Sequence, residues 1–462
     1  MYYLAIDIGA SSGRHIIGSY ENGKLIIEEM YRFPNGMKKN ADGTLVWDSE
    51  ALFGYVKAGI AECVKKGKSP SYIGIDTWGV DFALLDEDGN RIGDTVGYRD
   101  SRTAGMDDEV YKLIPEKELY ARTGIQKEMF NTVYQLMAVK KNNPEYLEKA
   151  DRILMMPEYL NYLLTGEKCS EYTNATTGQL VNAASCDWDF DIIRRLGYPE
   201  KIFGELFCPG HIVGELSAEI AEETGCYGAK VILPATHDTG SAVVSVPTNS
   251  EDVIYISSGT WSLIGVERLT PDTSEESRLH NFTNEGGFDK RYRYLKNITG
   301  LWMIQSMKKE LGGDYTFDML CEMAQEYDST KLRIDVNDRR FMAPESMIDE
   351  VKTALGCSEL SIGELFAVVY HSLAECYRKS VEEIEAMLGR PMRAIHIVGG
   401  GSRDEYLCRL TAEKCGKPVY AGPKEATAIG NITAQMISTG VFTDLREARN
   451  VIYNSFNVKE IK

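Results

Sequence analysis

Short apolar runs alternate with turns of small and polar residues over the first thirty positions of the chain. Residues 2–8, Tyr-Tyr-Leu-Ala-Ile-Asp-Ile, have the composition of a buried strand, and residues 14–20 and 25–29 have that of two more. Small residues at 9–13 and the stretch Glu21-Asn22-Gly23-Lys24 suit the tight turns between them. The pattern predicts an antiparallel three-stranded start to the fold.

Further along, the spacing of apolar residues changes between the period of a helix and that of a strand. Residues 49–66 place Leu52, Val56, Ile60 and Val64 four positions apart, which is the spacing of one helix face. Gly166 and Gly225 suit the C-caps of two other helices. The predicted helices are 49–66, 131–149, 157–165 and 217–225, and the predicted strands are 72–76, 82–85 and 230–233. This mixture indicates an α/β protein.

The second half of the chain repeats the order of the first. Strands at 253–257 and 262–267 flank a turn of Ser and Gly residues, as the strands at 2–8 and 14–20 do. The polar segment before them is rich in turn residues. We therefore expect two domains, residues 1–246 and residues 247–462.

A long amphipathic helix and a glycine run follow in the second half. Apolar residues recur every three to four positions over 361–388. A strand at 394–398 leads into Gly399-Gly400-Gly401, and Ser402 with Glu405 has the spacing of a capping box that starts the next helix. A strand at 418–420 and a helix from Glu425 to Ser438 complete the predicted second domain.

The size and charge of the chain limit the kinds of protein it can be. With 462 residues it exceeds a single hydrophobic core, and its 43% hydrophobic content is typical of an ordinary globular α/β protein. A net charge of -18 disfavours nucleic acid and anionic membranes as partners. A nucleotide site must therefore be a local exception, built from backbone N–H groups, an Arg or Lys side chain and Mg²⁺.

The spacing of cysteine and histidine residues disfavours disulfide and zinc chemistry. The ten cysteines are scattered without a C-x-x-C pair, as is usual for reduced core residues, and the six histidines have no zinc-binding spacing. No apolar run approaches the ~18–20 residues that cross a bilayer. Asp7 interrupts the apolar run at the N-terminus, so we expect no signal peptide and a cytoplasmic protein.

The segment Ala235-Thr236-His237-Asp238-Thr239-Gly240-Ser241 follows an apolar strand and carries the strongest chemical signal. A carboxylate held at the mouth of a strand between small residues can take a proton from a hydroxyl, which makes Asp238 a candidate general base. The same residues also suit an Asx-turn or a helix N-cap, and His237 by itself is more typical of a loop histidine. The structural and chemical roles of Asp238 do not exclude each other.

Three loops of small residues at strand ends are candidates for binding phosphate. Backbone N–H groups in such loops can wrap an anion, Arg14 can neutralise a phosphate, and Asp7 can hold Mg²⁺ through water. Each loop alone is also compatible with an ordinary turn, but together with Asp238 they favour phosphoryl transfer to an alcohol. The loops are Asp7-Ile8-Gly9-Ala10-Ser11-Ser12-Gly13-Arg14, Ser257-Ser258-Gly259-Thr260 and Gly399-Gly400-Gly401-Ser402.

Two further stretches are compatible with ligand contacts. Trp78 and Gly79 could supply an apolar wall and a backbone contact for a sugar, although a core tryptophan between two turn carboxylates is the simpler interpretation. Asn297 and Gln305 could contact a ligand, although their segment also has the composition of an ordinary helix N-terminus.

Together these stretches resemble the FGGY carbohydrate kinases over nearly the full length of the chain. Asp76-Thr-Trp-Gly, Ala175-Thr-Thr and Lys296-Asn-Ile are similar to the branch of the family that acts on L-rhamnulose. The resemblance implies two ribonuclease H-like domains of the actin-like ATPase class with a cleft between them. It also implies transfer of the ATP γ-phosphate to the 1-hydroxyl of L-rhamnulose, in L-rhamnose catabolism. The stretches that carry it are Asp7–Arg14, Asp76–Phe82, Ala175–Leu180, Ala235–Thr239, Ser257–Ser262, Asn284–Gly287, Lys296–Trp302 and Val398–Ser402.

The resemblance also implies roles for individual residues, with Asp238 as the proton acceptor. The chain departs from the family pattern at Gly240, where alanine is also usual, and around Tyr134-Gln135-Leu136, where no contact is inferred. The implied ATP contacts are Ala10, Ser11, Ser12, Gly13, Arg14, Thr260, Gln305 and Gly401; the implied sugar contacts are Gly79, His237, Asp238, Thr239 and Asn297; and Asp7 is the implied contact to Mg²⁺ through water.

Two other functions stay open from the sequence. One is kinase action on another ketose or polyol, such as L-fuculose or xylulose. The other is an actin-like, ATP-dependent switch that assembles or binds partners, which the sugar-side stretches disfavour. A monomer or a homodimer that binds a small sugar and ATP is compatible with the chain.

Overall fold

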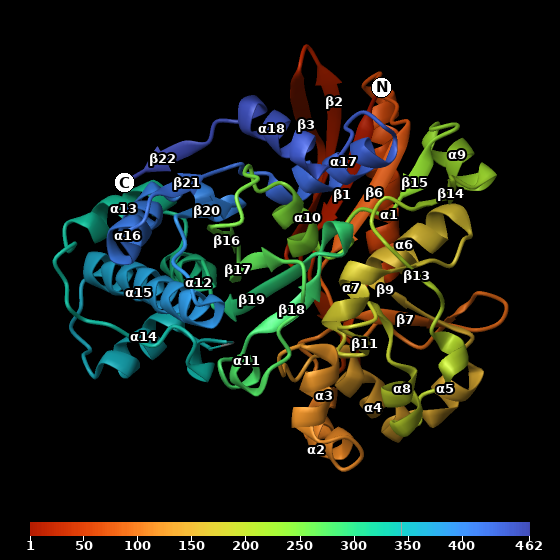
Figure 1. Cartoon of the computed structure of the whole chain (residues 1–462), viewed down its shortest axis with the longest axis horizontal. Helices are drawn as coiled ribbons and strands as arrows, with labels where there is room; N and C mark the ends of the chain where they lie inside the picture. The colour runs from red at the N-terminus through yellow and green to blue at the C-terminus, as the bar shows by residue number, and fades with distance from the viewer. Residues whose placement is uncertain (343) are drawn as a thin grey trace. The chain divides into compact units, whose positions relative to one another are not determined.

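The computed structural model (Figure 1) describes residues 1–342 and 344–462. These residues group into two units. The predicted boundary after residue 246 lies next to Ser245, where the first segment of unit 1 ends. A division at that single point stays a prediction, because each unit is built from three segments. Unit 1 contains Met1–Ser245, Glu267–Tyr294 and Thr427–Ser455, and unit 2 contains Val246–Val266, Leu295–Ala426 and Phe456–Lys462.

A mixed six-stranded sheet forms the centre of unit 1. In spatial order its strands are β14 (Ile212–Glu215), β15 (Lys230–Ile232), β6 (Tyr72–Thr77), β1 (Tyr3–Ile8), β2 (Ser12–Glu21) and β3 (Lys24–Pro34). β1, β2 and β3 are antiparallel neighbours, which confirms the predicted start of the fold. β6 runs parallel to β1 and to β15, and every residue of β1 is buried.

Helix α1 (Ser49–Lys65) covers this sheet as its apolar spacing predicts. Asp48 caps its N-terminus by accepting a hydrogen bond from the N–H of Ala51, and Leu52, Val56 and Ile60 are buried in the core that includes β1 and β6. Helices α6 (Met156–Thr165) and α9 (Ala218–Thr224) end at Gly166 and Gly225, both in the left-handed region. The predicted glycine C-caps are therefore confirmed.

The helix predicted over 131–149 is two helices in the structure, α4 (Thr132–Asn142) and α5 (Pro144–Lys149). The apolar spacing continues through both, but proline lacks the N–H that a helix interior needs and disfavours helical backbone in the residue before it. Asn143 accordingly has an extended φ of -140°. Residues of α4, among them Val133, Tyr134 and Leu136, form the centre of a second core in unit 1.

The other helices and strands that lie mainly in unit 1 have at most 13 residues each. They are β4 (Met37–Lys39), β5 (Leu45–Trp47), β7 (Phe82–Leu85), β8 (Arg91–Ile92), α2 (Met106–Tyr111), α3 (Glu116–Thr123), β9 (Arg152–Met155), β10 (Ser170–Glu171), α7 (Tyr172–Thr177), β11 (Val181–Asn182), β12 (Asp187–Trp188), α8 (Phe190–Arg195), β13 (Leu206–Phe207), α10 (Asp238–Val244), α11 (Glu275–Leu279), α17 (Ala426–Ser438) and α18 (Leu445–Ser455).

A seven-stranded sheet repeats the plan of the first. β16 (Val253–Ser258) pairs antiparallel with β17 (Ser262–Arg268) and parallel with β20 (Ala394–Val398), as β1 pairs with β2 and β6. The predicted internal repeat is therefore confirmed. The full order is β18 (Thr283–Gly286), β19 (Tyr292–Ile298), β17, β16, β20, β21 (Val419–Ala421) and β22 (Lys459–Ile461).

The long helix α15 (Ile362–Leu388) lies beside α13 (Phe317–Gln325) and α16 (Glu405–Cys415) in unit 2 (Figure 1). A capping box of Ser361 and Glu364 starts it. The remaining helices of unit 2 are α12 (Trp302–Leu311) and α14 (Met347–Leu355).

The predicted capping box of Ser402 and Glu405 is wrong. Asp404 is the N-cap of α16 and accepts a hydrogen bond from the N–H of Leu407 at 2.9 Å, whereas the hydroxyl of Ser402 donates to the carbonyl of Gly399 at 2.7 Å. The glycine run first forms a 3₁₀ turn, which delays the start of the helix.

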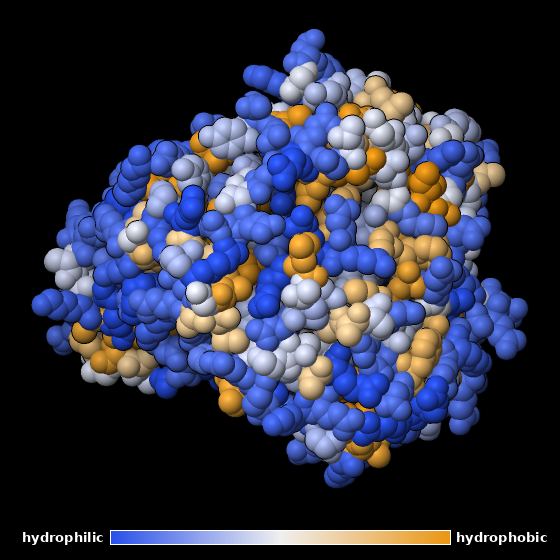
Figure 2. Space-filling view, viewed as in Figure 1, coloured by the Kyte–Doolittle hydropathy of each residue, from blue (hydrophilic) through white to orange (hydrophobic). Residues whose placement is uncertain are grey.

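The surface is mostly hydrophilic, and the cysteines are not paired. Hydrophilic side chains dominate the face shown in Figure 2, and apolar side chains gather there only in small groups. Each of the ten cysteines is a free thiol. None of the helices in the described ranges combines the length and the hydropathy needed to span a bilayer.

Two helical glycines of unit 1 differ in what surrounds them, and substitution by alanine should separate them. A Cβ at Gly430 in α17 would lie 1.7 Å from the carbonyl oxygen of Ser241 in α10, whereas a Cβ at Gly54 in α1 would meet open space. We expect Gly430→Ala to lower the free energy of unfolding by about 2 kcal/mol through overpacking. Gly54→Ala should raise it by about 0.5–1 kcal/mol, because alanine loses less backbone entropy. Urea unfolding of both variants measures this, and equal stability of Gly430→Ala and the parent would contradict the close packing of α10 on α17.

Candidate active site

The carboxyl ends of β1 and β6 bring acidic residues together in unit 1. Asp7 and Asp76 are paired positions of these parallel strands. The N–H of Thr77 donates to the carbonyl of Thr236 at 2.9 Å, two residues before Asp238. Asp238 therefore begins α10 beside the ends of both strands. Ligands of open α/β sheets bind outside strand ends of this kind.

Asp76 is the most buried member of this cluster. Burial raises the pKa of Asp76 well above its usual range, and the nearby Asp7 carboxylate raises it further, while a hydrogen bond from the amide of Asn431 at 2.6 Å opposes the shift. Asp7 is paired with Arg14, whose Nε lies 3.0 Å from Oδ2. Burial thus disfavours a negative charge on Asp76, and Arg14 balances the charge of Asp7, at a place where a polyphosphate would have to approach.

The oxygen atoms of this cluster suit a hydrated magnesium ion. Oδ1 of Asp76 is buried and accepts no hydrogen bond from the described residues, and Asp7 occupies the neighbouring position. Mg²⁺ prefers oxygen ligands and keeps several of its waters. No set of three acidic, histidine or cysteine side chains in residues 1–342 and 344–462 is arranged to hold a metal.

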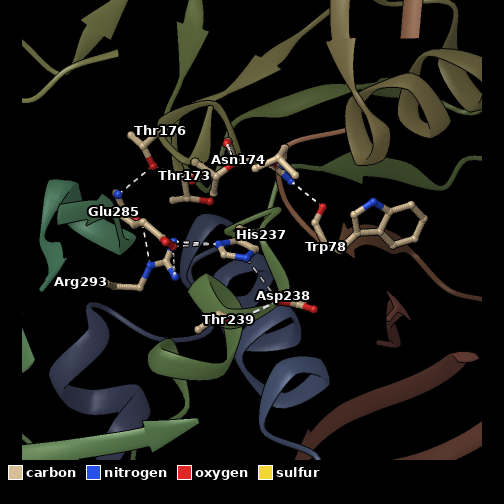
Figure 3. A network of polar contacts seen from close by, with 12 residues as sticks. Trp78, Thr173, Asn174, Thr176, His237, Asp238, Thr239, Glu285 and Arg293 are labelled. Atoms are coloured by element: carbon tan, nitrogen blue, oxygen red, sulfur yellow. Dashed lines mark hydrogen bonds and ion pairs between the residues drawn. The ribbon is translucent and has the colours of Figure 1, made fainter. Parts of the chain in front are cut away.

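Asp238 is the first residue of α10 and not its N-cap. His237 occupies the N-cap position, so the Asp238 carboxylate is not used to cap the helix. The hydroxyl of Thr239 donates to Oδ1 of Asp238 at 3.0 Å, and Nε2 of His237 lies 3.6 Å from the same oxygen (Figure 3). The Asp238 side chain is 30% exposed, so its carboxylate can meet a hydroxyl of a bound ligand.

A buried carboxylate fixes the segment that precedes Asp238. Glu171 accepts hydrogen bonds from the N–H groups of Thr173 at 2.7 Å, Asn174 at 3.1 Å and Thr236 at 3.2 Å. The hydroxyl of Thr236 lies 2.8 Å from Glu171 and 2.7 Å from Glu158. Burial, followed by the charge of Glu171, raises the pKa of Glu158 to about 8. A protonated Glu158 can share this hydroxyl with Glu171, so the Thr236 segment and the start of α7 are tied together.

Gly79 lies in a strained turn. The N–H of Asp81 donates to the carbonyl of Gly79 at 2.9 Å, and Val80 between them has a φ of 68°, a region that β-branched residues rarely adopt. The hydroxyl of Thr132 donates to the carbonyl of Val80 at 2.7 Å, and the N–H of Val80 donates to Thr177 at 3.1 Å. A Cβ at Gly79 would lie 2.9 Å from the Thr177 hydroxyl. Strain that is enforced in this way is common at binding sites.

Trp78 is a core residue. This is the simpler of the two roles that its sequence context allows. Its ring lies 3.9 Å from that of Trp47, and both indole N–H groups donate to Oδ2 of Asp81, at 2.9 and 2.6 Å. Gln135 donates to the other oxygen of Asp81 at 2.9 Å. Gln135 therefore helps to hold Asp81, the last residue of the turn that begins at Gly79.

A loop and a helix start meet in unit 2. The N–H groups of Leu301 and Trp302 donate to the carbonyls of Gly259 and Thr260, each at 3.1 Å, which fixes this loop at the beginning of α12. Gln305 lies one turn further along the helix, where its N–H donates to Leu301 at 2.8 Å.

The glycine run Gly399–Gly401 packs against the loop that contains Gly259 and Thr260. A Cβ at Gly401 would lie 2.0 Å from the hydroxyl oxygen of Ser258 and 3.3 Å from the side chain of Leu301. The Ser258 hydroxyl is buried and has no hydrogen-bond partner among the described residues. Thr260, Gln305 and Gly401 thus surround one small region of unit 2.

The site residues predicted from the sequence are divided between unit 1 and unit 2. Gly13 is buried, with a Cβ position 2.1 Å from the Phe33 ring, so it serves the packing of β2 on β3. Sequence reasoning missed Glu171, Glu285 and Arg293, although Glu285 lies in one of the stretches that carry the resemblance. Unit 1 holds Asp7, Ala10, Ser11, Ser12, Gly13, Arg14, Gly79, His237, Asp238 and Thr239, and unit 2 holds Thr260, Asn297, Gln305 and Gly401.

Two family models match this chain. The model of the N-terminal domain of the FGGY family of carbohydrate kinases matches residues 2–245, and the model of its C-terminal domain matches residues 254–439. A rhamnulokinase of Oceanobacillus iheyensis is 48% identical over 98% of this chain and 97% of that protein. A rhamnulokinase of Halalkalibacterium halodurans is 48% identical over 99% of this chain and 98% of that protein.

Solved structures share the fold at much lower identity. Xylulose kinase from Lactobacillus acidophilus has a TM-score of 0.83 at 16% identity, covering 100% of this chain and 93% of that one. Plasmodium falciparum glycerol kinase with ADP has a TM-score of 0.80 at 14% identity, covering 100% of this chain and 94% of that one. The predicted two-domain α/β kinase fold is therefore confirmed, and the chain belongs to the FGGY family of carbohydrate kinases.

Proposed function

We propose that this chain transfers the γ-phosphate of ATP to the 1-hydroxyl of L-rhamnulose, giving L-rhamnulose 1-phosphate and ADP. Relatives that are 48% identical over nearly the whole chain are named rhamnulokinase. The observation that carries the proposal is the Asp238 carboxylate, which is partly exposed beside Asp7 and Asp76 at the strand ends.

Asp238 acts as the general base in this proposal. Its carboxylate accepts the proton of the sugar hydroxyl as that oxygen attacks the γ-phosphorus, and the bond from phosphorus to the ADP oxygen breaks. General-base help is typically worth ~10²–10⁴ in rate, and less where the transition state is loose. Positioning and charge stabilisation therefore supply the larger share.

The ATP phosphates are bound by the two sets of small-residue loops. Ala10 to Arg14 contribute backbone N–H groups and one guanidinium, and Thr260, Gln305 and Gly401 contact the nucleotide. Asp7 would hold Mg²⁺ through water. When bound, Mg²⁺ supplies charge neutralisation of the phosphates.

The sugar is bound by Gly79, His237, Thr239 and Asn297. The Gly79 turn offers a backbone surface without a side chain, which matches the lack of room for a Cβ there. The 6-methyl group of a deoxy sugar gives a single apolar contact worth about 1–3 kcal/mol, so some turnover of related ketoses is expected.

We further propose that the enzyme works in the cytoplasm, where ATP is supplied. A monomer and a homodimer both fit the proposal, because every proposed catalytic contact comes from one chain. Light scattering coupled to size-exclusion chromatography would measure the mass of the assembly.

Replacing the base should stop turnover without removing nucleotide binding. We expect Asp238→Asn to lower kcat at least ~100-fold, because the amide cannot accept the proton, while the Kd for ATP stays nearly unchanged. A coupled ADP-release assay and calorimetry measure the two quantities. Asp88→Asn, in an exposed turn, is the matched control and should keep full activity. Normal turnover in Asp238→Asn would remove the base assignment.

A sugar panel should identify the substrate. With Mg²⁺ present, we expect kcat/KM for L-rhamnulose to exceed that for xylulose, which lacks the methyl group, by about 10- to 200-fold. Chelation of Mg²⁺ should abolish turnover of every sugar. A higher kcat/KM for L-fuculose or xylulose would make the chain a kinase of that ketose. ATP-dependent light scattering without turnover of any sugar would instead indicate an assembling switch protein.

A further inference from the structure

Two stretches that the proposed reaction leaves unused meet beside His237. The N–H of Gly286 in β18 donates to the hydroxyl of Thr176 in α7 at 2.9 Å (Figure 3). A Cβ at Gly286 would lie 2.5 Å from the ring of Tyr172, so the strand lies directly against the helix. The close approach leaves no room for a side chain larger than that of glycine at position 286. It also places the neighbouring Glu285 beside His237.

A fully buried arginine completes the group. The Arg293 side chain in β19 is 0% exposed, and its Nε donates to the carbonyl of Gly286 at 2.8 Å. Its Nη1 lies 3.0 Å from Oε2 of Glu285. Burial opposes ionisation of Glu285, but the charges around it, that of Arg293 first, lower the pKa of Glu285 below its usual range. Both charges are therefore present and compensate each other.

The third contact of Arg293 determines where His237 carries its proton. Nη2 of Arg293 lies 3.1 Å from Nδ1 of His237 (Figure 3). A guanidinium can only donate, so Nδ1 must be the unprotonated, accepting nitrogen in this contact. A neutral imidazole then carries its proton on Nε2, the nitrogen that lies 3.6 Å from Oδ1 of Asp238.

The carboxylate of Glu285 is the competing partner of the same ring nitrogen. Its Oε2 lies 3.2 Å from Nδ1 of His237, close enough for an ion pair. Within the described part of the chain, however, this oxygen has no partner that meets hydrogen-bond geometry, whereas the contact between Nη2 of Arg293 and Nδ1 of His237 does meet it. The geometry favours the Arg293 contact and the Nε2–H tautomer that it requires.

We propose that the buried guanidinium of Arg293, whose charge Glu285 balances, fixes His237 as its Nε2–H tautomer, so that His237 donates toward Asp238 and orients the carboxylate for proton transfer. Arg293 and Glu285 are positioning residues, since they act through His237. The catalytic part rests on the proposed function, whereas the tautomer does not. His237 Nε2 and Asp238 Oδ1 lie 3.6 Å apart here, and the proposal requires this separation to shorten to a hydrogen bond when the ligand is bound, as catalytic contacts commonly do.

Ring-nitrogen NMR of the full-length protein with ¹⁵N-labelled histidine tests the tautomer directly. In the parent we expect His237 to show an unprotonated Nδ1 and a protonated Nε2 at neutral pH, with the signals identified by their loss in His237→Gln. A protonated Nδ1 in the parent overturns the proposal without any further variant.

Substitution then tests the positioning role. Arg293→Lys keeps the charge but loses the planar fork, and we expect a mixture of tautomers and a kcat about 10- to 100-fold lower, with the KM for ATP unchanged. Arg122→Lys, which alters the bidentate pair with Asp189 elsewhere in unit 1, is the matched control and should leave the His237 signals and kcat as they are.

The two possible failures are distinguishable. If Arg293→Lys changes the tautomer but keeps the parent kcat, the positioning role is overturned. If the parent has the expected tautomer but phosphorylates no sugar, the proposed function fails and the assignment of the tautomer stands. Should Arg293→Lys not fold, Glu285→Gln gives the second measurement: it keeps the Arg293 contact, so the tautomer should persist, and its loss would contradict the proposal.

Discussion

The site depends on the satisfaction of a few buried charges. Glu171 lies in the interior of unit 1, where an ionised carboxylate without partners would cost several kcal/mol. Its partners are N–H groups of Thr173, Asn174 and Thr236, which come from two distant parts of the chain. Because they must converge on one carboxylate, the segment that carries Asp238 has a single position relative to α7.

The same requirement organises the two sides of Asp238. On one side, Asp76 is held by Asn431, and it lies beside the Asp7 that is paired with Arg14. On the other side, Arg293 and Glu285 neutralise each other against His237. Asp238 itself lies between them with its side chain partly exposed. The surrounding charges are thus fixed before a ligand arrives, which is how electrostatic preorganisation works.

Close backbone approach gives the site its shape. Gly79, Gly286 and Gly430 each lie where a Cβ would clash with Thr177, Tyr172 or Ser241. The glycines therefore allow the turn, strand β18 and helix α17 to approach α7 and α10 without intervening side chains. The strained φ of Val80 persists because Thr132 and Thr177 hold both of its backbone polar groups.

Apolar periodicity and local turn chemistry were sufficient for much of the fold. The spacing of Leu52, Val56 and Ile60 determined helix α1, and glycines determined the ends of α6 and α9. Local patterns failed where neighbours compete: Pro144 divides a continuous apolar face, and the 3₁₀ turn after Gly399 moves the next helix start to Asp404.

The sequence by itself determined the candidate base, the small-residue loops and the family, because these depend on residue type and order. Only the tertiary structure placed Asp76, Glu171, Glu285 and Arg293 around the segment that carries Asp238. Buried charges are stable only with partners, and those partners lie far apart in the chain, so no local pattern could identify them.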